Sequence, residues 1–318
     1  MTEILGFTPD GEGEHDFLWV EKEGQNTAWV AGALAGFAGI RVGDVGFAGL
    51  KDRHAVARQW FSVRRPAGDK ADWSRCDVAG IHILEVTRHG RKLRRGAHRG
   101  NHFRLALRGT GDISGVVIDQ LKAVREQGVP NYFGEQRFGH GARNLEMARQ
   151  LFAGRRLPRN RKSLALSAAR SFLFNCVLDR RVADGTWDRL IPGDSANLDG
   201  SGSLFHVESV DDELQRRAEE LDLHPTGALW GSGNSPVSGD VLELERAVAA
   251  ANAGLAGGLE AQRVARARRS LRVRVNEFTW VAEDERTLWL DFSLTRGAFA
   301  TAVLRELVQA PPTAGAEP

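Results

Sequence analysis

The order of its strand-like and helical patterns constrains the fold of this chain more than any other feature. Strand-like runs occur at residues 15–22, 45–50, 59–64, 81–88 and 102–108. A helical pattern begins at Asn26 or Thr27 and runs to about Gly39, and others cover Ile113–Glu126, 143–153 and 164–183. The last of these is apolar nearly all round, which predicts a buried helix. A chain in which most strands precede most helices is typical of an α+β fold.

Composition changes after about Gly185. Residues 193–210 are rich in Gly, Ser and Asp, and residues 224–240 have a loop-like composition. Helices are predicted at 240–256 and 259–270, strands at 271–280 and 286–294, and a helix at 297–308 before a tail predicted to be disordered. We therefore predict a discontinuous domain, 1–154 and 271–318, with a second domain inserted over 155–270.

Several functional classes lack sequence support. The 318 residues suffice for two domains, and 42% hydrophobic with 26% charged residues is typical of a soluble globular protein. No apolar run approaches the ~20 residues of a membrane span, and the N-terminus does not resemble a signal peptide, so we expect the cytoplasm. Cys76 and Cys176 lie outside any metal-binding spacing, and HExxH, GxxxxGK[ST] and GxGxxG motifs are absent. We expect no metal and no cofactor.

Positive charge is concentrated although the net charge is only +2. Residues 88–104 contain seven Lys or Arg, three His and no acid. Such a strip suits a nucleic-acid backbone, so we predict phosphate contacts for Arg88, Arg91, Lys92, Arg94, Arg95 and Arg99. Residues 155–162 and 263–274 are also basic, but the latter is equally consistent with a solvated helix face paired with nearby Glu. The acidic stretch 208–222 should face away from a nucleic acid.

One carboxylate stands among basic residues at Lys51-Asp52-Arg53-His54, directly after the apolar run Val45–Leu50. A cationic surround keeps a carboxylate ionised, either in an ion pair or as a nucleophile near an anionic substrate. Charge pattern alone favours a solvated turn with an ion pair.

Longer blocks of sequence favour a catalytic role for this carboxylate over a solvated ion pair. FAGLKDRHAVARQWFSV, which contains Asp52, resembles the active-site motif of the TruD family of tRNA pseudouridine synthases. Further blocks resemble the same family in the expected order: HGRKLRRGAHRGNHFRL, PNYFGEQRFG, SAARSFLFN, the segment Leu198–Phe205, ALWGSG and GAFATAVLREL. Together they extend from Leu5 to Leu307, which is far more specific than one short motif.

The resemblance implies isomerisation of uridine-13 in certain tRNAs to pseudouridine. It also implies a pseudouridine-synthase catalytic domain with a mixed, mainly antiparallel sheet and an inserted α/β TRUD domain, which together form an RNA cleft. In the family the TRUD region often starts earlier, near residue 128 here. The implied partner is tRNA, with no membrane, and the family precedent suggests a monomer.

Residue roles follow from the same motifs. Asp52 corresponds to the catalytic aspartate of the family, Asn101 to a contact of the target uridine, Phe103 to the ring that packs on the target base, and Phe299 to another substrate contact. Outside this resemblance, core packing would be the expected role of either Phe, and a turn that of Asn101. Lys51, Arg53 or Arg104 could supply the cation near Asp52. His54, Gln59 and the Tyr132–Arg137 loop are expected to support the site.

The chemistry leaves three routes open. Asp52 could attack C1′, assist loss of the C2′ proton to form a glycal, or attack C6 of uracil.

Two other functions are weighed against catalysis. Family members usually carry a further N-terminal segment with a Pro-Glu-Asp-Phe-like motif ahead of the position of Met1. The alternative is therefore a non-catalytic tRNA-binding or RNA-chaperone protein, which would regain activity with that segment. A DNA-binding protein has no helix-turn-helix or zinc pattern to support it.

Overall fold

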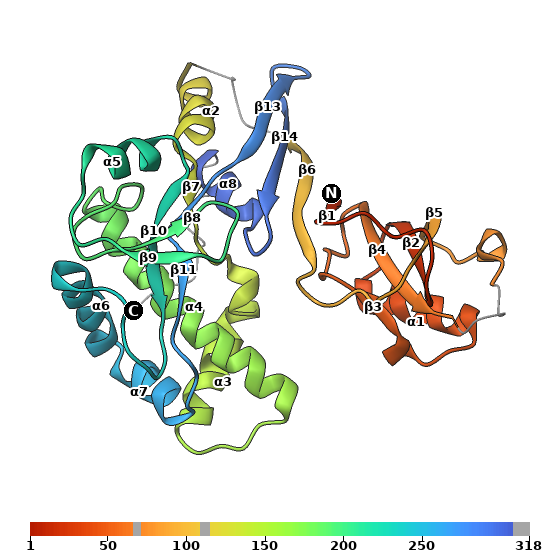
Figure 1. Ribbon diagram of the computed structural model, residues 1–318, viewed down its shortest axis with the longest axis horizontal. Helices are drawn as coiled ribbons and strands as arrows, with labels where there is room; N and C mark the ends of the chain where they lie inside the picture. The colour runs from red at the N-terminus through yellow and green to blue at the C-terminus, as the bar shows by residue number, and fades with distance from the viewer. Residues whose placement is uncertain (66–70, 109–114, 308–318) are drawn as a thin grey trace. The chain divides into compact units, whose positions relative to one another are not determined.

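The computed structural model describes residues 1–65, 71–108 and 115–307 (Figure 1). Contacts within the chain group it into two compact units. Unit 1 comprises Met1–Gly109 and Glu277–Gly297, and unit 2 comprises Thr110–Asn276 and Ala298–Pro318. The predicted helix start at Ile113 and the predicted disordered tail lie outside the described residues.

Unit 1 is built on an eight-stranded sheet. Its strands are β1 (Thr2–Leu5), β2 (His15–Lys22), β3 (Val45–Phe47), β4 (Ala57–Arg64), β5 (Ile81–His89), β6 (His98–Arg108), β13 (Asn276–Ala282) and β14 (Thr287–Thr295). The order is β13-β14-β6-β1-β4-β2-β5, and β3 pairs with β4. The β1–β4 pair is parallel, whereas β6 pairs antiparallel with both β1 and β14, and β2 with both β4 and β5. The predicted mixed, mainly antiparallel sheet is confirmed.

Helix α1 (Thr27–Ala38) packs against this sheet. The Asn26 side chain accepts a hydrogen bond from the Trp29 amide at 2.9 Å, which caps the helix start. Gly39 ends it in the left-handed conformation with φ 66°, which glycine adopts without strain. Val30 and Leu34 join Leu18 and Phe61 of the strands in a buried cluster. The helix predicted here is confirmed. The described part of the unit also contains two 3-10 turns, η1 (Val42–Asp44) and η2 (Trp73–Arg75).

Unit 2 is mainly helical. Its described helices are α2 (Gly115–Gln127), η3 (Glu135–Arg137), η4 (His140–Ala142), α3 (Arg143–Phe152), α4 (Arg159–Ala183), α5 (Asp212–Glu219), α6 (Gly239–Ala251), α7 (Ala253–Ala261) and α8 (Ala300–Leu307). Helix α4 lies beside α3 and α7 (Figure 1). Its Leu173, Phe174 and Leu178 are buried in the largest cluster of the unit, as the apolar sequence predicts.

The described residues of unit 2 also form two small sheets. One has the order β11-β10-β8-β9, formed by β11 (Ala267–Ser270), β10 (Leu223–Leu229), β8 (Ser195–Leu198) and β9 (Leu204–His206). The other pairs β7 (Val129–Pro130) with β12 (Arg272–Val273). No helix within the described residues combines the length and apolar character that crossing a membrane requires.

The loop predicted at 224–240 is wrong over its first six residues, which belong to strand β10. Pro225 and Gly227 suggested a loop, but both are accommodated in the strand. Pro225 pairs with Ala196, and a Cβ added to Gly227 would lie 2.8 Å from a Leu271 methyl carbon and 3.1 Å from the Phe174 ring. Glycine therefore allows this strand to approach α4 closely.

The helix predicted at 259–270 is wrong after its first three residues. Helix α7 ends at Ala261, and Ala267–Ser270 form strand β11 against β10. There Arg268 reaches Glu245 of α6 at 2.8 Å and Thr226 of β10 at 2.7 Å. These tertiary partners override the helical propensity of an Ala/Arg-rich segment.

The α+β class is confirmed. The compact units divide the chain near residues 109 and 276, whereas the predicted domains divide it at 154 and 270. A compact unit need not coincide with a functional domain. The division into a catalytic domain and a TRUD insertion stays a prediction.

Candidate active site

The segment that carries Lys51 and Asp52 connects β3 to β4 in unit 1, and buried polar side chains hold it in place. The Lys51 amide donates to Thr27 Oγ1 at 2.9 Å. That hydroxyl donates to Gln59 Oε1 at 2.9 Å, and Gln59 Nε2 donates to the Gly49 carbonyl at 3.3 Å. Thr27 and Gln59 are fully buried, so the main chain just before Asp52 is fixed by the core.

The Asp52 carboxylate is exposed while its own main chain is anchored from below. Its Oδ1 accepts a hydrogen bond from the His54 amide at 3.0 Å. Its carbonyl oxygen accepts from Nζ of Lys22, which also donates to the Gln25 carbonyl at 2.8 Å. Burial lowers the pKa of Lys22, and the charge of Asp52 acts against that shift. Lys22 is therefore a buried cation that lies close to Asp52.

Lys22 was not among the residues expected to supply this cation. Of those, Arg53 donates to the Gly24 carbonyl at 2.9 Å, and Arg104 places its guanidinium 5.0 Å from the centre of the Trp289 ring. The sequence does contain a signal for Lys22. Leu18 and Lys22 lie four residues apart on β2, so their side chains point to the same face of the strand, and both are fully buried. A lysine at an inward-facing strand position is unusual.

Lys51 links the Asp52 segment to strand β6. Its Nζ lies 2.8 Å from Glu3 Oε2 and donates a hydrogen bond to Asn101 Oδ1. Glu3 and Asn101 face each other across β1 and β6, and the side chains of Lys51 and Glu3 are only 2% and 0% exposed. Burial raises the pKa of Glu3, and the positive charge of Lys51 opposes the shift. Because an ammonium group only donates, Oδ1 of Asn101 must face Lys51, which leaves its Nδ2 as a donor for a ligand.

The two predicted aromatic contacts belong to different units. In unit 1, Phe103 lies two residues after Asn101 on β6 and therefore on the same face of the strand. It stacks on Phe292 of β14, with ring centres 5.4 Å apart and an angle of 25°. In unit 2, Phe299 precedes α8, and its ring centre lies 6.0 Å from that of Phe133.

A glycine brings Phe133 and Phe299 near each other. A Cβ added to Gly134 would lie 2.9 Å from Oγ1 of Thr301, in the first turn of α8. A larger residue at position 134 would therefore push α8 away from the Phe133 loop.

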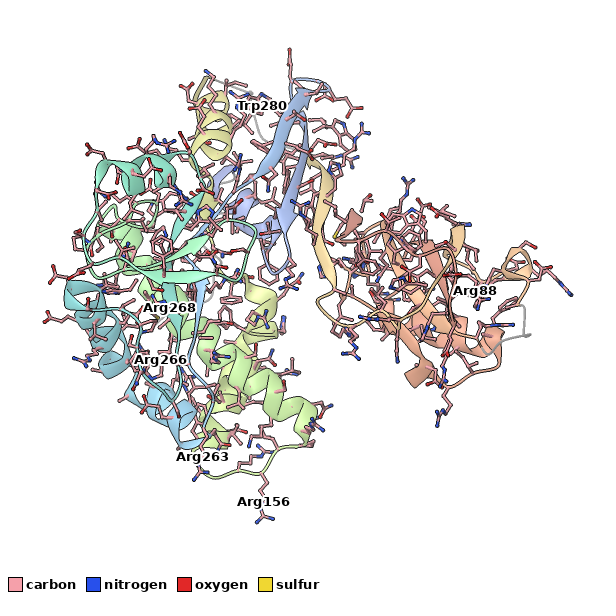
Figure 2. All side chains as sticks on the ribbon, in the orientation of Figure 1. Arg88, Arg156, Arg263, Arg266, Arg268 and Trp280 are labelled. Atoms are coloured by element: carbon pink, nitrogen blue, oxygen red, sulfur yellow. The ribbon has the colours of Figure 1, made fainter. Side chains whose placement is uncertain are left out.

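The basic segment is largely accessible to solvent. Its exposed members are Arg91, Lys92, Arg94, Arg95 and Arg99. Arg88, labelled in Figure 2, is half-buried, donates to the Gly13 carbonyl at 2.8 Å and lies 3.6 Å from Asp16 Oδ1. His89 similarly lies 2.7 Å from Asp10. Acids distant in the sequence thus partly neutralise the start of the segment, and its phosphate-binding role stays a prediction.

The other basic clusters differ in how their charge is neutralised. In the cluster 263–274, Arg268 is paired with Glu245, and Arg266 packs its guanidinium 4.1 Å from the centre of the Trp230 ring (Figure 2). Arg272 is buried and donates to the carbonyls of Ala218 and Leu223. Several of these arginines therefore serve the interior of unit 2. By contrast, Arg156 projects from the connection between α3 and α4 (Figure 2).

Comparison with known proteins identifies the family of this chain. The family tRNA pseudouridine synthase D (TruD) matches residues 1–154 and 142–307. The tRNA pseudouridine synthase D of Methylococcus capsulatus is 48% identical over 314 residues, which cover 98% of this chain and 89% of that protein. That of Aeromonas salmonicida is 47% identical over 311 residues, covering 98% and 88%.

A solved structure supports the fold. The crystal structure of a Methanosarcina mazei protein assigned as tRNA pseudouridine synthase D (TruD) superposes with a TM-score of 0.74. It covers 98% of this chain and 91% of the other, at 20% identity. Family match, close relatives and fold agree, and this chain belongs to the TruD family of tRNA pseudouridine synthases.

Proposed function

We propose that this protein isomerises uridine-13 of tRNA to pseudouridine and that Asp52 is the catalytic carboxylate. The names of the relatives support the tRNA substrate and the pseudouridine product. One observation carries the role of Asp52: its carboxylate is exposed, whereas the main chain on both sides of it is held by the buried Lys22 and Thr27. A reactive group on a rigidly held backbone is pre-organised for catalysis.

The reaction needs one ionised carboxylate and no change in composition. The N1–C1′ bond breaks, the uracil turns, and C5 bonds to C1′, while C5 loses a proton and N1 gains one. Asp52 could attack C1′ and later be displaced by C5, remove and return the C2′ proton through a glycal, or add to C6. Each route uses the Asp52 carboxylate as a nucleophile or a base.

The residues proposed to bind the target nucleotide are Phe103, Asn101 and Phe299. The uridine must leave its stack, and Phe103 and Phe299 offer rings against which the flipped base can pack. Asn101 presents Nδ2, which can donate to a uracil carbonyl or a ribose oxygen. The exposed arginines between Arg91 and Arg99 are proposed to contact phosphates, which makes tRNA binding weaken steeply with salt. We also propose a monomeric enzyme of the cytoplasm.

The main test is Asp52→Asn, which keeps the size of the side chain and removes its charge. We expect pseudouridine formation to fall below detection while tRNA affinity is retained, because an exposed carboxylate contributes little to anion binding. Asp77→Asn, an exposed acid of the same unit, is the matched control and should behave like the wild type. A normal modification rate in Asp52→Asn would refute the assignment of Asp52.

Two altered tRNAs test the position of the target uridine and the route of the reaction. A tRNA with cytidine at position 13 should yield no pseudouridine, and product at another position would contradict the proposed specificity. Deuterium at C2′ of uridine-13 should slow the reaction only if the C2′ proton is removed. Wild-type protein that binds tRNA without forming pseudouridine would instead support the non-catalytic alternative.

A further inference from the structure

Positive charge gathers where α3 is connected to α4 in unit 2. This connection and the first turn of α4 carry five cations, namely Arg155, Arg156, Arg159, Arg161 and Lys162. No Asp or Glu occurs between Met147 and Leu178. The four arginines are exposed and the lysine is half-buried, so most of this charge faces solvent.

Arg263, which follows α7, lies at the same end of unit 2. Helix α7 packs against α3, and a Cβ added to Gly258 of α7 would clash with the ring of Phe152 at the end of α3. Arg263 is exposed, and Figure 2 shows it at the same end of the unit as Arg156. We call Arg263 and the five cations of the α3–α4 connection the basic end of unit 2.

The charges of the basic end are not neutralised within the protein. Among the described residues, no carboxylate forms an ion pair with any of its six members. Arg155 Nη1 donates to the neutral Gln150 Oε1 at 2.5 Å. Glu260, the acid nearest to Arg263 in the sequence, accepts a hydrogen bond from Trp230 Nε1 at 2.9 Å. The basic end therefore has charge that an external anion can neutralise.

Two local features of the basic end lower the stability of the protein. The first turn of α4 contains three cations and no acid, although the positive end of the helix dipole repels cations there. Arg263 has a φ of 53°, a left-handed conformation that glycine usually supplies after a helix. Residues that break such rules without an internal compensation are expected to serve a function.

The basic end lies apart from the ring proposed to contact the target uridine in unit 2. Arg137 lies 5.9 Å from the ring centre of Phe299 and donates to Ser167 of α4 at 2.8 Å. Ser167 follows Arg159 by eight residues, which is about 12 Å along a helix that rises about 1.5 Å per residue. One phosphate group does not span this distance.

We propose that the basic end of unit 2 binds the sugar-phosphate backbone of the tRNA substrate, at a stretch other than the target nucleotide. A guanidinium presents parallel N–H groups that match two oxygens of a phosphate, and five of the six cations are arginines. Exposed cations along a surface suit the repeating charge of a nucleic-acid backbone. This inference rests on the proposed function, which makes tRNA the polyanion that the protein meets.

The first test is the triple variant Arg156→Gln/Arg159→Gln/Arg161→Gln, whose tRNA binding is measured over a range of salt concentrations. Loss of three phosphate contacts should reduce the slope of log K against log salt by about 2 to 3. The dissociation constant and KM should rise by about 10- to 100-fold at low salt. The value of kcat at saturating tRNA should stay that of the wild type, because these contacts hold the substrate without touching the reacting atoms.

A second triple variant controls for the overall charge of the protein. Arg41→Gln/Lys122→Gln/Arg216→Gln removes the same number of charges from exposed residues that already pair with Asp44, Asp119 and Glu213. It should keep the salt slope of the wild type. Equal losses in the two triple variants would mean that only the net charge matters, and the proposal would be wrong.

Arg263→Gly separates a role in binding from a role in stability. Glycine adopts the left-handed conformation without strain, so the urea midpoint should rise while tRNA affinity falls by about 2- to 5-fold. Ala142→Gly is the matched control, because Ala142 is also exposed and has a φ of 55°. It should raise the midpoint and leave the affinity unchanged. An unchanged affinity in Arg263→Gly would remove this residue from the site.

Footprinting of the tRNA with hydroxyl radicals locates the contact. The wild type should protect a backbone stretch that becomes accessible in the Arg156/Arg159/Arg161 variant, while the protection around residue 13 is kept. Loss of protection only around residue 13, or a salt slope equal to that of the wild type, would overturn the proposal. So would a loss of binding to phosphatidylserine vesicles with unchanged tRNA binding, which would indicate a membrane surface.

Failure of the proposed function would have a different signature. Wild-type protein that forms no pseudouridine would refute the proposed function. Dissociation constants and footprints do not depend on turnover, so they would still test the basic end in that case.

Discussion

In unit 1, Lys51 is buried 2.8 Å from the carboxylate of Glu3, whereas in unit 2 the Arg137 guanidinium donates to the hydroxyl of Ser167 at 2.8 Å. Both cations contact groups proposed to touch the substrate, Lys51 through Asn101 and Arg137 through Phe299. The charge of Lys51 is neutralised within the protein, so its effect is to orient Asn101 and to hold the segment of Asp52. The charge of Arg137 has no internal counterpart among the described residues and is available to an anion.

A buried cation with a carboxylate partner and one without such a partner should respond differently to mutation. Removal of one member of an internal ion pair leaves the other charge buried and unpaired, so stability suffers. Removal of a cation without such a partner leaves no orphaned charge, so the main loss should be in ligand binding. The following variants compare the two cases, from the largest expected effect to the smallest.

Lys51→Met should lower the free energy of unfolding by about 3–5 kcal/mol, because Glu3 loses its partner in the core. Urea denaturation at pH 7 measures this change. Lys122→Met removes an exposed lysine that pairs with Asp119 at 3.3 Å and should cost less than about 1 kcal/mol. Adding Glu3→Gln to Lys51→Met should recover part of the loss, and no recovery would mean that the ion pair is not its cause.

Acidification should destabilise unit 1 through His98. Burial, aided by the charges of Lys51 and Arg296, lowers the pKa of His98 to about 4 from its usual value near 6.5. The unfolded chain therefore binds a proton first, and stability present above about pH 6.5 is lost as the pH falls toward 4. After discounting for partial exposure, we expect a loss of about 1–2 kcal/mol.

Urea midpoints measured between pH 7 and pH 4.5 test this titration. The decline should be shallower in His98→Gln than in the wild type. His82→Gln replaces an exposed histidine of the same unit and should leave the wild-type slope unchanged. Equal slopes in all three proteins would show that His98 does not titrate in this range.

Arg137→Gln should change the free energy of unfolding by less than about 1 kcal/mol. It loses a hydrogen bond to Ser167 and contacts with two rings, but it also removes a charge from a partly buried position. Urea denaturation beside Lys51→Met gives the direct comparison. A loss as large as that of Lys51→Met would mean that Arg137 is a structural cation, and the contrast between the two units would disappear.

Local patterns predicted much of the fold. The apolar residues of α4 and the caps of α1 depend on neighbours in the sequence, so periodicity and capping residues identified them. Strands β10 and β11 were missed because their stability comes from pairing with each other and from the approach of Gly227 to Phe174. Their own composition resembles a loop and a helix.

In the candidate site, too, some residues were predicted from the sequence and others were found only in the structure. The resemblance of the Lys51-Asp52 segment to a family motif directed attention to Asp52, and the same motifs indicated Asn101 and Phe103. The contacts of Lys22 with Asp52 and of Glu3 with Lys51 were not expected. For Lys22, its inward-facing position in a predicted strand was a signal that could have indicated a role. The structure supplied these partners because each belongs to a strand distant from the Asp52 segment in the sequence.

By itself the sequence determined the α+β class, the buried α4 helix and the segments that carry the candidate site, because hydrophobic periodicity and motif order are properties of consecutive residues. Only the tertiary structure decided which charges are neutralised, since an ion pair depends on distance in space and on burial. It therefore distinguished Lys51, which pairs with Glu3, from Arg137, which donates to the Ser167 hydroxyl.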